Sequence, residues 1–224
     1  MGKKEFQIVL ARYKVVICCA IMMIMLGLDA PHKTAFIRHK MDFYVSILVI
    51  IFGCDLMYQE LFGEMKDVFR KFGAKQNFYI SLKRLGVQWL FFLGVSSVFF
   101  WESYLRVEEK AGSVLAFYGK VLYSTGVTIV FFSVFVTFMM LLTKSQYSGM
   151  GISIIIWVVL TSPLGEKIGP IWNPIWTSQK ADKISDIPWI QGKLVAILIS
   201  VILLAGICYL CHHLREGVKE ATSL

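Results

Sequence analysis

The strongest chemical signature in the chain is a Cys-x-x-Cys-His pattern formed by Cys208, Cys211 and His212. At this spacing two thiols and an imidazole can hold a c-type haem covalently. Haem attachment needs a site outside the cytoplasm, whereas the topology derived below places these residues at the cytoplasmic end of a membrane helix. We therefore expect apolar packing here, with His212 and His213 at the membrane interface and with no cofactor or metal bound.

Two other catalytic patterns are incomplete. Glu108 and Glu109 resemble the paired glutamates of intramembrane prenyl proteases, but Ser113 occupies the position where that pattern has arginine. The Gly-Lys pairs that end at Lys120 and Lys193 are followed by Val and Leu, so neither makes a phosphate-binding loop. The chain is therefore expected not to be an enzyme, and any ATP hydrolysis is expected on a partner.

Composition indicates which elements must carry these residues. Of 224 residues, 57% are hydrophobic and 17% charged, against about 45–50% and about 25% in soluble domains. This excludes a soluble globule and predicts a polytopic, all-α membrane protein. The net charge of +8 fits cations beside anionic lipid better than nucleic-acid binding. All five cysteines lie in apolar runs and are expected to be free thiols.

Charge-free stretches predict six spans in a single transmembrane domain that covers residues 1–224. Their approximate bounds are 15–29, 43–59, 85–101, 121–143, 146–164 and 194–211. Asp55 interrupts the second span, which makes it a candidate pathway residue. The alternatives are that Asp55 reaches the nearby interface or that this span ends earlier.

The distribution of charge predicts the orientation. With a cytoplasmic N-terminus, the inner segments hold 13 Lys and Arg and the outer segments 10, and the outer segments also carry eight acidic residues. The cytoplasmic side is then the more positive one. We expect a multi-pass protein of a bacterial plasma membrane with both termini in the cytoplasm.

Three further segments are expected to lie at the membrane surface. An amphipathic helix is predicted over residues 3–14, and a second over 61–72, where apolar residues recur at helical spacing among mixed charges. The outer segment 165–193 contains three prolines and three tryptophans. It is expected to form short broken helices in the headgroup layer.

Taken together, these elements resemble the membrane subunit of a type-2 ABC exporter, the ABC-2 permease family. The run from Tyr58 to Glu64 is similar to the acidic, glycine-containing stretch that follows the second span in that family, with Gly63-Glu64 in place of Gly-Thr. The segment from Asn173 to Trp176 is similar to the family's proline-containing outer segment.

The resemblance implies a coupling helix over residues 61–72 that binds a groove of an ATPase subunit. The residues implied in this contact are Glu60, Glu64, Met65, Lys66, Asp67, Phe69, Arg70 and Phe72. A solvated interfacial helix is the alternative for this segment.

The resemblance also implies the partners. They are a second permease subunit, identical or related, surrounding membrane lipids, and two ATPase chains that bind ATP and Mg. The mostly apolar spans favour a hydrophobic or amphipathic cargo, such as a peptide, a lipid-linked molecule or a drug. A polytopic enzyme acting on a lipid-linked substrate and a non-transporting immunity or anchor protein remain as alternatives.

Overall fold

The computed structural model describes residues 12–28, 34–54, 58, 74–107, 113–175 and 187–221. The described part is helical and contains no strand, so the predicted all-α class is confirmed. Its helices are α2 (Arg12–Leu28), α3 (Thr34–Gly53), α6 (Ala74–Arg106), α7 (Val114–Thr143), α8 (Gln146–Thr161), α9 (Pro163–Ile168) and α10 (Ile187–Ala221).

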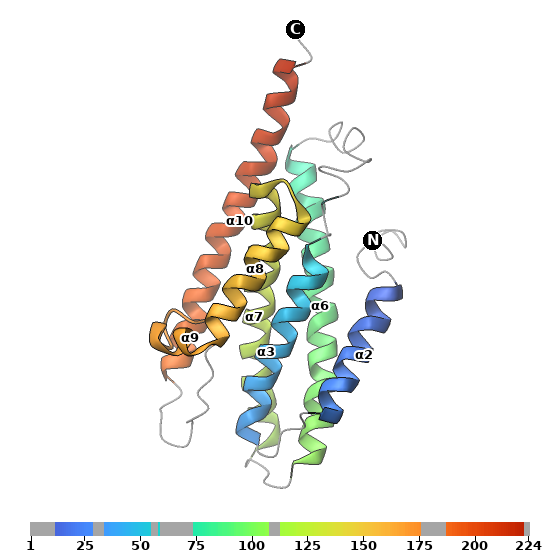
Figure 1. Ribbon diagram of the computed structural model, residues 1–224, viewed down its shortest axis with the longest axis vertical. Coiled ribbons are helices and arrows are strands. Elements are labelled where there is room, and N and C mark those ends of the chain that lie inside the picture. The colour runs from blue at the N-terminus through green and yellow to red at the C-terminus, as the bar shows by residue number, and fades with distance from the viewer. Residues whose placement is uncertain are drawn as a thin grey trace.

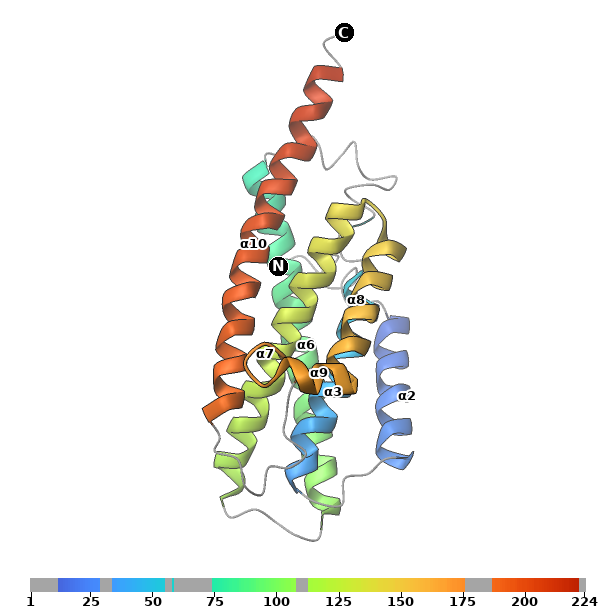
Figure 2. The ribbon, with the colours of Figure 1, turned by 60° about the vertical axis from the view of Figure 1, so that its left-hand side comes forward.

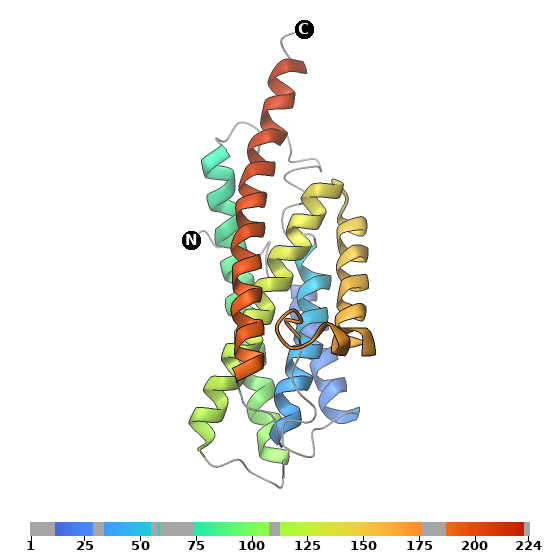
Figure 3. The same cartoon turned by 90° about the vertical axis from the view of Figure 1, so that its left-hand side faces the viewer.

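The long helices run up and down in one bundle (Figure 1). Helices α3, α7 and α10 start at the lower end of the view and run upward, whereas α2, α6 and α8 run downward. The start of α2 and the end of α10 therefore point to the same end of the bundle, as do the end of α3 and the start of α6. The last turns of α10 extend beyond the other helices (Figures 1 and 3).

Helix α7 forms the centre of the bundle. Most of its apolar stretch is buried, whereas less than a quarter of the apolar stretch of α10 is buried. Helix α2 lies at the margin of the bundle (Figure 2). A water-soluble protein would bury the apolar face of α10, so its exposure fits a helix that faces lipid.

Three of the described helices are long and apolar enough to cross a membrane, at Gln76–Arg106, Val114–Thr143 and Trp189–His212. The predicted count of six is therefore met only in part. Helices α2 and α8 have shorter apolar stretches, at Lys14–Ile24 and Gln146–Thr161. Helix α3 is not one of these candidate spans, because every segment of it that is long enough to cross a membrane contains three charged residues, Arg38, Lys40 and Asp42.

The helices extend beyond the charge-free stretches from which the spans were predicted. Helices α6, α7 and α10 have 33, 30 and 35 residues, which is about 45–53 Å and exceeds a hydrocarbon core of about 30 Å. The second predicted span, 43–59, is replaced by α3, which begins at Thr34 and ends at Gly53.

The fifth predicted span, 146–164, also ends early. Helix α8 stops at Thr161, and a new short helix, α9, begins at Pro163. Proline has no N–H to continue the hydrogen-bond ladder and disfavours helical geometry in the residue before it. Ser162 caps the new helix, with its side chain accepting from the Leu164 N–H. The outer segment thus starts as a broken helix, and residues 176–186 of it lie outside the described part.

Candidate functional site

A buried ion pair joins helices α3 and α10. Lys193 Nζ of α10 lies 2.7 Å from Asp42 Oδ2 of α3. The two side chains are 1% and 0% exposed. Asp42 lies about 12 Å along α3 from Thr34, and Lys193 stands one turn inside the stretch Trp189–His212. The pair therefore lies within the bundle, and Lys193 points inward instead of extending to the surface.

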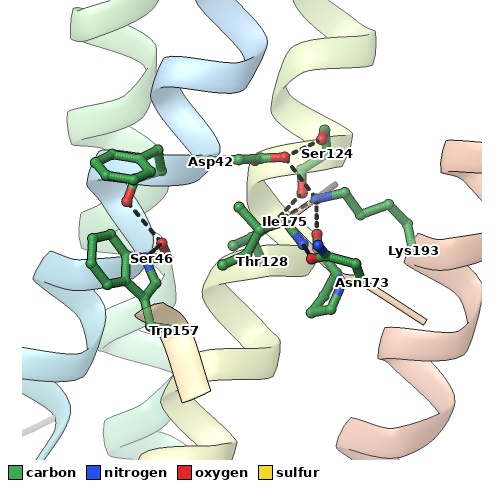
Figure 4. A network of polar contacts seen from close by, with 10 residues as sticks. Asp42, Ser46, Ser124, Thr128, Trp157, Asn173, Ile175 and Lys193 are labelled. Carbon is green, nitrogen blue, oxygen red and sulfur yellow. Dashed lines mark hydrogen bonds and ion pairs between the residues drawn. The ribbon is translucent and has the colours of Figure 1, made fainter. Parts of the chain in front are cut away.

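The surroundings of Lys193 satisfy its ammonium group completely. Besides Asp42, Nζ donates to Thr128 Oγ1 at 2.6 Å and to the Pro174 carbonyl at 2.6 Å. These three contacts use all three N–H donors of a lysine. Ser124, one turn before Thr128 on α7, donates to Asp42 Oδ2 at 2.7 Å. Figure 4 shows Lys193 reaching these partners on α3, on α7 and in the segment 169–175.

A cation–π contact covers the ion pair toward the nearer end of the bundle. Arg38, one turn before Asp42, lies with its guanidinium carbon 4.5 Å from the centre of the Trp189 ring, and Trp189 is one turn before Lys193. The i, i+4 spacing on both helices stacks the two contacts in two layers. A basic and an aromatic residue thus cover the buried ion pair on the side of the nearer end of the bundle.

Two glycines allow the segment 169–175 to reach the pair. A Cβ atom on Gly192 would lie 2.1 Å from the Pro170 carbonyl oxygen, and one on Gly165 would lie 2.9 Å from Asn173 Nδ2. Asn173 donates to the carbonyl of Leu160 at 2.8 Å and accepts from the Ile175 N–H at 3.0 Å. This closes the end of α8, whose last carbonyls have no helical partner, and it places the Pro174 carbonyl against Lys193.

A second polar cluster lies toward the other end, along one face of α6. Asn77, Ser81, Arg84 and Gln88 recur at helical spacing, and all four are buried. Ser81 donates to the Asn77 carbonyl at 2.7 Å. Neither polar atom of the Gln88 amide has a hydrogen-bond partner among the described residues. A buried amide with no partner is costly, so a group outside the described structure is expected to contact it.

The region between the two clusters is mostly apolar. A Cβ on Gly53 of α3 would lie 3.3 Å from Gln88 Nε2, so Gly53 marks the level of the second cluster. Gly53 and Asp42 are 11 residues apart on α3, or about 16 Å. Between these levels the core contains large apolar side chains such as Phe92 and Phe132, together with a few buried hydroxyl groups, among them that of Ser46, which accepts from Trp157 Nε1 at 2.7 Å.

The chemistry of the site is electrostatic. Lys193 donates all of its N–H groups and is not free to act as a nucleophile, whereas Asp42 Oδ1 has no hydrogen-bond partner in the described structure. No group of His, Cys, Asp or Glu in the described residues is arranged to hold a metal ion. All five cysteines are free thiols; Cys208 is exposed and Cys211 is buried. The site can clamp three helices together or offer one carboxylate oxygen to a ligand.

The residues predicted from the sequence lie outside the described structure. These are Asp55 and the candidate coupling residues Glu60, Glu64, Met65, Lys66, Asp67, Phe69, Arg70 and Phe72, together with most of the N-terminal segment 3–14. The described part brings none of them together, and their proposed contacts stay predictions.

Sequence reasoning missed Asp42 and Lys193 because it bounded the spans by charge. Asp42 directly precedes one charge-free stretch and Lys193 directly precedes another, so both were assigned to loops. One signal was available in the sequence. Asp42 and Lys193 have opposite charges, and each lies at the start of a predicted span that begins on the outer side, so the two could meet. Comparison of the chain with models of protein families, with curated proteins and with solved structures finds no match, so the functional argument starts from this geometry.

Proposed function

We propose that this chain is the transmembrane permease subunit of an ATP-driven exporter of the ABC-2 type. In this proposal it spans a bacterial plasma membrane six times with both termini in the cytoplasm. A second permease subunit completes the transporter, and two ATPase subunits, which bind ATP and Mg, supply the energy. The cargo is a hydrophobic or amphipathic molecule.

The observation that carries the proposal is the pair of buried polar clusters on either side of a mostly apolar region. Polar and charged groups inside membrane helices are costly and are typical of transport pathways. Here one cluster is built on Asp42 and Lys193 and the other on the α6 face that ends at Gln88. An amphipathic cargo needs both kinds of surface, and a clamp between α3 and α10 is an element that can open and close.

The direction of the helices supports the placement of the coupling segment. Helix α3 ends and α6 starts at the end of the bundle where α10 also ends (Figure 1). Helix α3 therefore ends, and α6 starts, on the side proposed as cytoplasmic. An ATPase bound there would act directly on α3, which carries Asp42, and on α6, which carries Gln88.

Co-expression with an ATPase encoded beside this chain tests the proposal. We expect the two to purify as a complex, and we expect charge reversal at Glu64, Lys66 and Arg70 to abolish both assembly and stimulation of ATP hydrolysis. The matched control reverses Glu166 and Lys167, which are exposed on α9 toward the opposite end. Absence of a complex, or a complex that survives the first reversal, would overturn the proposal. Activity of the isolated chain on a lipid-linked substrate would instead favour the enzyme.

A further inference from the structure

A second feature of the bundle is an open apolar groove between α2 and α6, with a volume of about 840 Å³. Met22 and Met23 of α2 form one wall, and Leu90, Gly94 and Val98 of α6 form the other. The groove lies along one of the stretches long enough to cross a membrane. Neither the proposed coupling to an ATPase nor the buried ion pair uses it.

The end of the groove carries opposite charges. Glu102 and Arg106 line it there, and their closest atoms are 3.9 Å apart, with both side chains about half exposed. A pair this loose and this exposed contributes little by itself. Both side chains are exposed enough to contact a ligand that brings an anionic and a cationic group.

Aromatic side chains mark the depth of this charged pair. Trp101, directly before Glu102 on α6, is 46% exposed, and its ring contacts those of Tyr104 and Tyr118. Exposed tryptophan and clustered tyrosine are typical of the headgroup layer. The apolar part of the groove thus runs from the headgroup level into the hydrocarbon core.

The length and lining of the groove fit a lipid chain. Leu90 and Arg106 are about 24 Å apart along α6, which is long enough for an acyl chain crossing one leaflet of about 15 Å. The apolar walls suit such a chain, and the charged pair Glu102 and Arg106 at the end of the groove suits a headgroup that carries both charges.

We propose that the groove between α2 and α6 binds one phospholipid with a zwitterionic headgroup. An acyl chain lies between Met22 and Val98. The phosphate accepts hydrogen bonds from Arg106, as phosphates commonly do from guanidinium groups, and the headgroup amine donates to Glu102. This binding depends on the membrane location of the chain and not on an ATPase partner.

Gly94 provides a variant that fills the groove. A Cβ on Gly94 would meet no atom within 4 Å, so Gly94→Leu projects into the groove without a clash. Gly86 of the same helix has equally open space around it and does not line the groove, so Gly86→Leu is the matched control. Val98→Trp, at a groove residue that is 66% exposed, is a second blocking variant.

The test is retention of lipid after purification from vesicles of equal parts phosphatidylethanolamine and phosphatidylglycerol with the same acyl chains. Native mass spectrometry counts the lipids bound per chain, and circular dichroism confirms folding of each variant. We expect one bound phosphatidylethanolamine on the unmodified chain and on Gly86→Leu. Gly94→Leu and Val98→Trp should retain about tenfold less, the effect of displacing roughly two methylene groups from the groove.

Variants at the charged end test the headgroup. Glu102→Gln should reduce the preference for phosphatidylethanolamine roughly threefold, as expected for an exposed pair, and Arg106→Gln should lower the retention of both lipids. Equal retention of the two lipids by the unmodified chain would overturn the headgroup assignment. Two results would overturn the groove as a lipid site. One is that Gly94→Leu retains as much lipid as the unmodified chain. The other is that the unmodified chain is a dimer without bound lipid and that Gly94→Leu makes it a monomer.

Discussion

The bundle has two seams that are built in opposite ways. Along the seam between α3, α7 and α10, charged and hydroxyl side chains meet at hydrogen-bond distance, and glycines let the backbone approach closely. Along the seam between α2 and α6, apolar side chains leave an open groove. In lipid there is no hydrophobic force to close helices on one another, so contact depends on close packing and polar bonds. The first seam has both, and lipid can fill the second.

The difference predicts where the structure resists change. Each partner removed from the first seam leaves another buried group without its bond, whereas a side chain added to the second seam enters space that lipid otherwise occupies. Substitutions of similar size should therefore have large effects on one side of the bundle and small effects on the other.

The largest effect is expected for Lys193→Met. It leaves the Asp42 carboxylate buried, with Ser124 as its remaining donor, and removing one partner of a buried pair costs about 3–5 kcal/mol. Unfolding in mixed micelles with increasing dodecyl sulfate, followed by circular dichroism, measures the change. Lys120→Met, at an exposed position of the same charge, is the control and should stay within about 0.5 kcal/mol.

The double variant Asp42→Leu with Lys193→Met separates loss of a charge from loss of packing. Replacing both partners by apolar residues is often neutral, so the double variant should recover most of the stability that the single variant loses. A single variant that costs less than about 1 kcal/mol would show that the pair is not closed in the folded protein and would remove the contrast between the seams.

Gly192→Ala should have the next largest effect. The added Cβ would lie 2.1 Å from the Pro170 carbonyl oxygen, which forces the backbone apart and typically costs about 1–3 kcal/mol. Gly119→Ala on α7, where a Cβ meets no atom within 4 Å, should instead gain about 0.5–1 kcal/mol from helix propensity. The same unfolding measurement gives the sign of the change in the free energy of unfolding for both variants. A more stable Gly192→Ala variant would contradict the close approach of Gly192 to the Pro170 carbonyl.

A smaller effect is expected at the cation–π layer. Arg38→Met and Trp189→Leu each remove one side of a contact with a separation of 4.5 Å, and such contacts contribute about 0.5–2 kcal/mol. Both residues make other contacts as well, so a double-variant cycle is needed to isolate this pair. Additive losses in the cycle would show that Arg38 does not stabilise the bundle through Trp189.

These contrasts also explain how far the sequence could be interpreted by itself. The apolar runs predicted an all-helical membrane chain because hydropathy over a membrane length depends on local sequence alone. The starts of α3 and α10 were not predicted, because Asp42 and Lys193 lie inside these helices. Each is tolerated there because it pairs with the other, which is 151 residues away in the sequence. The groove was not predictable either, since it depends on how α2 and α6 meet. Asn173 and Pro174 were singled out by the resemblance to the outer segment of ABC-2 permeases, but their contacts with Leu160 and Lys193 appear only in the structure.

The smallest effect is expected for Gly94→Leu, and it tests the second seam directly. In detergent without lipid, the added side chain enters the open groove, so the free energy of unfolding should be unchanged or higher by up to about 1 kcal/mol through helix propensity. If Gly94→Leu instead destabilises the protein as much as Gly192→Ala, then α2 packs closely on α6 in the folded chain and the groove is not available to lipid. Unchanged stability together with loss of bound lipid would assign the seam between α2 and α6 to lipid, because a merely structural seam could not give both results.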